Sequence, residues 1–105
     1  MKYLRLKKQT DFQKLFQKGK RAYSASVMMV YRSSDKTYMG ISVGKKHGKS
    51  VKRNKIKRLI REAFRSAVTE MGGKYSIVFI PKVLEEYSFS SFERDIRWMI
   101  KKEKM

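Results

Sequence analysis

Basic side chains crowd into one short stretch of this chain, residues 45–65. Ten of its 21 residues are Lys or Arg, and Glu62 is the single acidic residue among them. Guanidinium and ammonium groups bind phosphates, and an arginine can grip two oxygens of one phosphate at once. The chemistry that this stretch indicates is the binding of a polyanion, either a nucleic acid or an anionic membrane surface.

The same stretch carries an apolar stripe at helical spacing, which centres on Ile60 and continues to about residue 71. A disordered basic tail has no such stripe, so we expect a helix that begins near Ser50, docks on a core and ends at Gly72-Gly73. A membrane-binding helix would need that stripe for lipid, which favours a nucleic acid. At about 100° per residue, a row of polar side chains falls opposite the stripe, one turn apart, as successive phosphates require. The row is Asn54, Arg58, Arg61 and Arg65, with Lys57 on its flank.

We expect a second anion site where this helix begins, because the free N–H groups of a helix N-terminus attract anions. Lys52 and Arg53 fall on the core side of the helix, so we expect them in its first turn, reaching toward the sheet. His47, in the preceding loop, fits a phosphate or 2′-hydroxyl contact, or a solvated side chain, better than a general base. The lysines of this region are Lys45, Lys46, Lys49 and Lys52.

Aromatic residues near the basic ones form a second candidate site. Phe12 and Phe16 lie one turn apart on a short predicted helix. Aromatic rings can stack on unpaired bases, but in a small α+β domain they often belong to the core. Both interpretations stay open for Phe12, Phe16 and Tyr31, whereas the core is favoured for Tyr38.

The other elements follow from periodicity and turn residues. Thr10–Gln13 fits a capping box that starts the short helix. The pattern predicts strands at residues 22–32, 37–44 and 74–80. An extra strand near residues 20–23 is an alternative. The second of these strands carries small side chains on one face, which leaves room for a groove with this strand at its base. Ser88 or Ser91 caps a last helix, with Trp98 as a partial cover of the core. The pattern predicts an α+β sandwich of one sheet with helices mainly on one face.

Length and composition limit the function. The 105 residues predict one domain, residues 1–105, with a net charge of +18. Residues 1–65 hold 20 basic and 3 acidic side chains, a net +17, whereas the rest hold 7 and 6, a net +1. Such one-sided charge costs stability unless phosphates compensate it. We see no membrane span, signal peptide or cysteine, and expect a cytoplasmic protein.

Catalysis by the chain itself is not indicated. The sequence holds one histidine, no cysteine and no metal-ligand spacing. From the residues alone, three classes of protein remain open. They are a structural RNA binder such as a ribosomal protein, a nucleoid-type DNA protein, and an independent nuclease, which the missing His or carboxylate cluster disfavours.

Residues 12–20, FQKLFQKGK, and 39–65, MGISVGKKHGKSVKRNKIKRLIREAFR, resemble the bacterial ribonuclease P protein subunit. Arg53-Asn54-Lys55 and the residues after them are similar to that family's RNR signature helix. Lys55 stands where the signature often has arginine, which keeps the charge but loses the bidentate geometry. A weaker resemblance extends from about Leu4 to Ile100.

The resemblance implies a fold, an activity and partners. The fold is a single-domain α-β-β-β-α-β-α sandwich, similar to the second domain of ribosomal protein S5, with a left-handed βαβ crossover. The family's members bind ribonuclease P RNA, which uses Mg²⁺ to remove the 5′ leader of precursor tRNA. By this resemblance the chain is a subunit of an endoribonuclease and is not catalytic alone. It is a cytoplasmic monomer, one per catalytic RNA, without a membrane partner, and the RNA holds most of the Mg²⁺.

The resemblance also implies roles for particular residues. One set would contact or border the catalytic RNA, and the other would line a groove between the first helix and the sheet that holds the leader. The first set is Lys45, Lys46, His47, Lys52, Arg53, Asn54, Lys55, Lys57, Arg58, Arg61 and Arg65. The second set is Phe12, Lys14, Phe16 and Tyr31.

Overall fold

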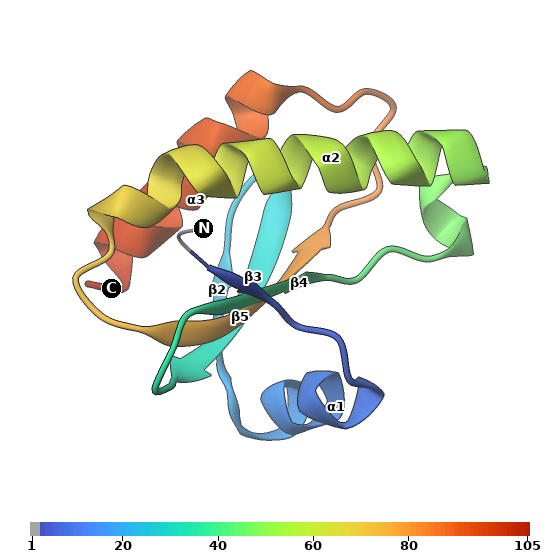
Figure 1. Cartoon of the computed structure of the whole chain (residues 1–105). Helices are drawn as coiled ribbons and strands as arrows, with labels where there is room; N and C mark the ends of the chain where they lie inside the picture. Colours follow the sequence, from blue (N-terminus) through green and yellow to red (C-terminus); the bar gives the residue numbers. More distant parts are fainter. Residues whose placement is uncertain (1–2) are drawn as a thin grey trace.

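The structure is a computed structural model that describes residues 3–105. Three consecutive strands, β2 to β4, lie between the helices α1 and α2 along the chain (Figure 1). Short 3₁₀ turns at Lys45–His47 and Val68–Glu70 precede and follow α2. The order is β1 (Leu4–Arg5), α1 (Gln9–Lys18), β2 (Lys20–Tyr23), β3 (Val27–Ser33), β4 (Tyr38–Ile41), α2 (Ser50–Ala67), β5 (Tyr75–Pro81) and α3 (Phe89–Lys102).

The five strands form one mixed sheet in the order β1-β4-β5-β3-β2. β3 is antiparallel to β2 and β5, whereas β4 runs parallel to both of its neighbours, β1 and β5. The basic helix α2 is therefore the crossover between two parallel strands. The expected mixed α+β fold is confirmed, with the two-residue strand β1 added in front of it.

One expected strand is two strands. The sequence predicts a strand over residues 22–32, but the chain turns at residues 24–26 and separates β2 from β3. The Ser24 hydroxyl stabilises this turn by accepting from the Val27 N–H at 3.2 Å. The extra strand near residues 20–23 is thereby confirmed, and the continuous strand is wrong because a serine turn interrupts it.

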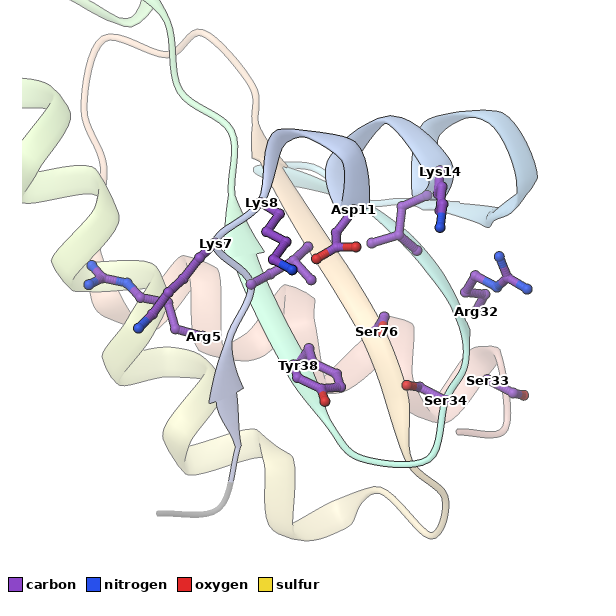
Figure 2. A pocket seen from close by; sticks show the side chains of 12 residues that line it. Arg5, Lys7, Lys8, Asp11, Lys14, Arg32, Ser33, Ser34, Tyr38 and Ser76 are labelled. Atoms are coloured by element: carbon purple, nitrogen blue, oxygen red, sulfur yellow. The ribbon is translucent and has the colours of Figure 1, made fainter.

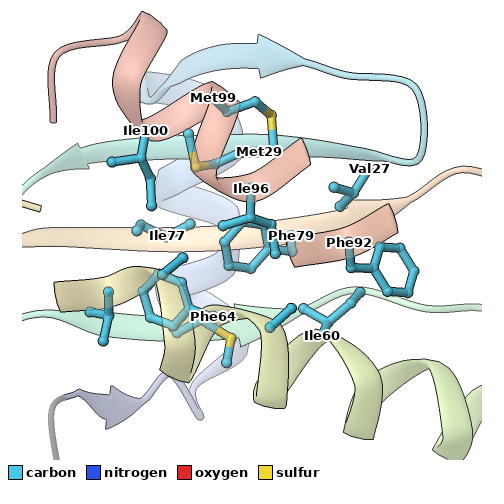
Figure 3. Packing of buried hydrophobic residues seen from close by; sticks show 14 of the residues in the cluster. Val27, Met29, Ile60, Phe64, Ile77, Phe79, Phe92, Ile96, Met99 and Ile100 are labelled. Carbon is cyan, nitrogen blue, oxygen red and sulfur yellow. The ribbon is translucent and has the colours of Figure 1, made fainter. Parts of the chain in front are cut away.

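Two apolar clusters lie on opposite faces of the sheet. α2 and α3 cover one face and α1 covers the other (Figure 1). The larger cluster interleaves residues of α2, α3, β3 and β5 (Figure 3), and the rings of Phe64 and Phe79 meet edge to face at 5.4 Å. Every apolar residue of the predicted α2 stripe from Ile56 to Ala67, except the half-buried Leu59, is buried. This burial fixes which side of α2 remains for solvent.

α1 sits very close to the sheet at Gly40. A Cβ at this position would lie 2.6 Å from Cζ of Phe12, so a larger residue would displace the Phe12 ring. The expected capping box is wrong: α1 begins at Gln9, and its N-cap, Lys8, makes no side-chain capping bond. The chain is already fixed before the helix by the Leu6 N–H, which donates to the Met39 carbonyl at 3.0 Å.

Hydrogen bonds hold α3 at its N-terminus and at a buried residue within the helix. Ser88 caps it, as expected, by accepting from the Ser91 N–H. The buried Asp95 accepts two hydrogen bonds from Ser26, at 3.1 Å from the N–H and 2.6 Å from the hydroxyl, which ties α3 to the turn between β2 and β3. Trp98 is 50% exposed and does not cover the core as expected, because Phe92, Ile96, Met99 and Ile100 already fill the stripe.

Candidate nucleic-acid interface

The outer side of α2 is a row of basic side chains, called here the basic face of α2. Its expected exposure is confirmed, since most of its members are exposed and two are half-buried at the sheet side. Among residues 3–105 the ion pairs found use the arginines of α3, and none uses a basic side chain of α2. Their charges are therefore available to an external anion. The face consists of Asn54, Lys57, Arg58, Arg61 and Arg65, with Lys55 exposed beside it.

The first turn of α2 differs in part from the expectation. Lys52 does not reach toward the sheet. Its Nζ lies 3.4 Å from the Glu85 carbonyl and 5.5 Å above the Tyr87 ring, in the loop before α3. Arg53 is half-buried, and its Nε is buried without a hydrogen-bond partner in the described part of the chain. Lys45, Lys46 and Lys49 are exposed, as a contact with an anion requires.

His47 is a structural residue, and its expected place at the RNA surface is wrong. The side chain is 2% exposed. Its Nδ1 accepts from the Gly44 N–H at 3.0 Å, so Nε2 carries the proton and donates to the Pro81 carbonyl at 2.7 Å. Both ring nitrogens are occupied, which fastens the lysine loop to the end of β5. Gly48, at φ +112°, then turns the chain into α2.

A groove of about 700 Å³ lies between the sheet-side flank of the basic face and the edge of the sheet, called here the α2 groove. β1 pairs with Tyr38 and Met39 at the start of β4, and beyond this pairing the buried Gly40 and the half-buried Ile41 line the floor of the groove. Phe12 of α1 lines it opposite Lys57 and Arg61 of α2. The structure thus brings an aromatic ring and unpaired cations into one groove. Its other lining residues are Tyr3, Arg5, Leu6, Lys7, Met39 and Arg65.

Arg5 and Lys7 were missed from sequence as groove residues. The signal was the alternation of residues 3–7, in which Leu6 is buried while Arg5 and Lys7 point to solvent. Two residues are too short a strand to predict, because the pairing with β4 and not the local sequence makes it.

The other expected groove residues are dispersed. Phe16 packs against the small apolar cluster under α1. Lys14 lies on the other flank of α1 and lines a separate hollow of about 600 Å³, called here the α1 pocket (Figure 2). The expectation that Lys14 lines the same groove as Phe12 is therefore wrong, because Leu15, which points into the sheet, separates the two flanks.

Tyr31 lies on the opposite face of the sheet, so its expected role in the groove is wrong. It is 6% exposed within the larger cluster, and its hydroxyl donates to Oε1 of Glu103 at 2.6 Å. Burial, and then the bond to Glu103, raise the pKa of Tyr31 above its ordinary value. The residue joins β3 to the C-terminal end of α3 and is a core tyrosine.

The geometry supports the binding of a polyanion. In residues 3–105, no three His, Cys, Asp or Glu side chains gather as a metal ion would require. The helices of this part of the chain include none that is long and apolar enough to cross a bilayer. The interface offers a row of cations that can bind phosphates and the Phe12 ring, on which a base can stack.

Comparisons with known proteins agree with this geometry. The family model described as Ribonuclease P matches residues 1–104. The chain is 36% identical, over 102 residues, to the ribonuclease P protein component of Clostridioides difficile, covering 92% of this chain and 89% of that protein. It is also similar to two solved ribonuclease P proteins, each at 30% identity and a TM-score of 0.82. The match with the Staphylococcus aureus protein covers 95% of this chain and 94% of that protein's chain. The match with the Thermotoga maritima protein covers 93% of this chain and 96% of that protein's chain.

Proposed function

Because the chain belongs to the ribonuclease P protein family, we propose that the basic face of α2 binds ribonuclease P RNA and that the α2 groove holds the 5′ leader of precursor tRNA. The chain is a protein subunit of ribonuclease P, an endoribonuclease that acts on precursor tRNA. It works in the cytoplasm as a monomer, one per catalytic RNA. The observation that carries the leader site is the position of Phe12 opposite Lys57 and Arg61.

A groove that combines the Phe12 ring with several cations favours single-stranded RNA. The bases of an unpaired leader are free to stack on Phe12, whereas the paired bases of the tRNA stem are not. Lys57 and Arg61 then meet the phosphates on either side of the stacked base. The groove therefore distinguishes a precursor from a mature tRNA, which lacks the leader.

The basic face of α2 suits the catalytic RNA. Asn54 and Arg58 are exposed outside the lining of the groove, whereas Lys57, Arg61 and Arg65 line it, so α2 can present different polar side chains to two RNAs at once. Catalytic RNA and substrate repel each other as polyanions. A protein of net charge +18 between them reduces that repulsion and strengthens the binding of substrate and Mg²⁺ without doing chemistry.

Magnesium is supplied to the reaction by the RNA. We propose that the protein itself holds no magnesium ion; among residues 3–105 no three His, Cys, Asp or Glu side chains lie together. We therefore derive no step of the cleavage through a metal ion on the protein. The protein's part is to bind, to position and to neutralise charge.

The test is precursor-tRNA cleavage at low Mg²⁺, by a bacterial ribonuclease P RNA with and without this protein. We expect the protein to restore correct 5′ cleavage and to be inert alone. Phe12→Ala should weaken the binding of precursor tRNA by about tenfold, from the loss of one stacked base, and leave that of mature tRNA unchanged.

Phe16→Ala is the matched control, because it removes the same ring from the same helix one turn away. Both rings pack beside the cluster under α1, but Phe12 lines the α2 groove and Phe16 does not, so we expect Phe16→Ala to lower stability without a selective loss of leader affinity. A protein that binds the RNA but gives no gain in rate or affinity would be a structural RNA binder instead. Cleavage by the protein alone would revive an independent nuclease.

A further inference from the structure

The lysine loop is residues 44–49, the segment that leads from β4 into α2 (Figure 1). Its three lysines are exposed, but His47 among them is 2% exposed. A polar ring is buried where its nitrogens find hydrogen-bond partners, and the partners of His47 show what it holds together. The lysines are Lys45, Lys46 and Lys49.

The two hydrogen bonds of the His47 ring connect it to different parts of the chain. Nδ1 accepts from the Gly44 N–H at 3.0 Å, and the His47 N–H donates back to the Gly44 carbonyl at 2.9 Å, which closes one turn within the loop. Nε2 donates to the Pro81 carbonyl at 2.7 Å, 34 residues away. The bond to Pro81 therefore joins the loop to the sheet, whereas the bond from Gly44 acts inside the loop.

The Pro81 carbonyl is a fixed point of the sheet. Pro81 is buried at the end of β5, where it pairs with Val27 of β3. The next residue, Lys82, donates its N–H to the Ser26 carbonyl at 3.0 Å, so the backbone on both sides of the Pro81 carbonyl is held in place. The bond with His47 is hard to exchange for water, because a buried acceptor without a donor is costly. The loop therefore takes its position from the sheet.

Lys52 supports the loop where it enters α2. It lies across Gly48 so closely that a Cβ at Gly48 would be 2.9 Å from Cδ of Lys52. Its Nζ lies 3.4 Å from the Glu85 carbonyl, in the segment after β5. The Tyr87 hydroxyl holds that segment by donating to the Lys82 carbonyl at 2.7 Å. The end of β5 and the residues after it thus support both the loop and the first turn of α2.

We propose that His47 is a positioning residue for the catalytic RNA, because its bond to Pro81 fixes Lys45 and Lys46 beside the start of the basic face of α2. This inference rests on the proposed function, since the loop must meet the RNA that this face binds. No ion pair found in residues 3–105 uses Lys45 or Lys46, so both are left for phosphates. A loop that is fixed before binding loses less conformational entropy on contact, which strengthens the complex.

The experiment titrates a bacterial ribonuclease P RNA with the full chain at several salt concentrations. His47→Phe keeps a ring of similar size and removes both ring hydrogen bonds. We expect about fivefold weaker binding and a salt dependence flatter by about one unit of log–log slope, because mobile lysines lose phosphate contacts. Unchanged affinity and slope in the folded variant would refute the inference.

Two further variants separate the two ring bonds. His47→Gln places an amide N–H near the position of Nε2 and can keep the bond to Pro81, whereas His47→Asn places a carbonyl oxygen near the position of Nδ1 and can keep the bond from Gly44. We expect His47→Gln to restore most of the lost affinity and His47→Asn to bind as weakly as His47→Phe. The opposite order would show that the turn inside the loop, and not the bond to the sheet, positions the lysines.

A double-mutant cycle shows whether His47 acts through the lysines. Lys45→Ala with Lys46→Ala should weaken binding by about tenfold, since two phosphate contacts are lost. In that background His47→Phe should cost less than about twofold, because no lysine remains at these positions to be placed. A loss as large as in the unaltered protein would mean that His47 does not act through Lys45 and Lys46.

The matched control is Tyr31→Phe, which also removes a hydrogen bond of a buried ring, the bond to Glu103 at 2.6 Å. Tyr31 pairs with Ile77 of β5, well before Pro81 on that strand. This variant should lower stability and leave RNA affinity and salt slope unchanged. An equal loss of affinity would assign the effect of His47→Phe to stability, and thermal unfolding verifies that each variant is folded at the temperature of the titration.

The outcomes separate this inference from the proposed function. If Lys45→Ala with Lys46→Ala binds the RNA as the unaltered protein does, the lysine loop does not meet the RNA and the role of His47 is refuted, although the basic face of α2 remains the RNA site. If the unaltered protein does not bind ribonuclease P RNA, the proposed function itself fails.

Discussion

The helices α2 and α3 cover the same face of the sheet, but their cationic side chains have opposite electrostatic surroundings. On α3, Arg97 meets Glu70 at 2.7 Å and Glu93 at 3.7 Å, and Arg94 meets Asp95 at 3.1 Å. On α2, no described basic side chain has an acidic partner. The same residue types therefore act differently: the arginines of α3 pair with acidic residues of the protein, and those of α2 are left for a partner.

The largest effect is expected from the basic face of α2. Arg58→Ala with Arg61→Ala should weaken the binding of ribonuclease P RNA by roughly tenfold per arginine, because each removes a charge-assisted hydrogen bond. The log–log dependence of affinity on salt should lose about one unit of slope per phosphate contact. Binding titrations at several salt concentrations measure both.

Arg94→Ala with Arg97→Ala is the matched control for this pair, since it also removes two positive charges. It should lower stability and leave the salt slope unchanged. An equal loss of RNA affinity in both variants would mean that net charge alone governs binding, and the distinction between the two helices would disappear.

The next largest effect is expected at Asp95, the buried acidic residue of α3. Asp95→Asn keeps the shape but loses the charge that accepts from Ser26 and Arg94. We expect a loss of about 1–3 kcal/mol in the free energy of unfolding, because strong buried acceptor bonds are weakened. Urea unfolding measures it, and RNA affinity should not change. Ser26→Ala provides the second arm of a double-mutant cycle, and additive losses would show that the two residues do not interact.

The dependence of the free energy of unfolding on pH tests the contribution of Asp95 in a second way. Burial alone would raise the pKa of Asp95, but the hydrogen bonds from Ser26 and Arg94 outweigh it and hold the pKa below its ordinary value. A depressed folded-state pKa contributes stability above the unfolded pKa of about 3.9, and this is lost as the pH falls through the folded pKa. Unfolding free energies below about pH 4 should therefore fall less steeply for Asp95→Asn. Parallel curves for the two proteins would remove Asp95 as the source.

The smallest effect is expected at Arg97, a half-buried residue within α3. Arg97 is partly exposed, and it also donates to the Ser66 hydroxyl of α2 at 2.7 Å. Arg97→Ala should cost about 1 kcal/mol or less of stability, since solvent screens such pairs. High salt should shrink the difference between variant and unaltered protein. A loss as large as that of Asp95→Asn would show that the contact with Ser66, and not the ion pairs, joins the helices.

Residues whose role depends on local pattern were predictable. The apolar stripe of α2 fixes which side packs on the sheet, and the row opposite it is exposed as expected. The Ser88 cap follows from the same local rules. Residues whose role depends on a distant partner were not: His47 bonds to Pro81, and Tyr31 bonds to Glu103, 72 positions away.

The sequence by itself determined that this chain presents a dense positive helix on a mixed α+β fold, because charge and helical periodicity are written along the chain. It also carried the resemblance to the ribonuclease P protein family. Only the tertiary structure decided which residues share a hollow. Phe12 meets Lys57 and Arg61, while Lys14 falls in a second pocket, because Leu15 must point into the sheet and so separates the flanks of α1. Such neighbourhoods depend on strand pairing and helix docking between distant segments, which no local pattern specifies.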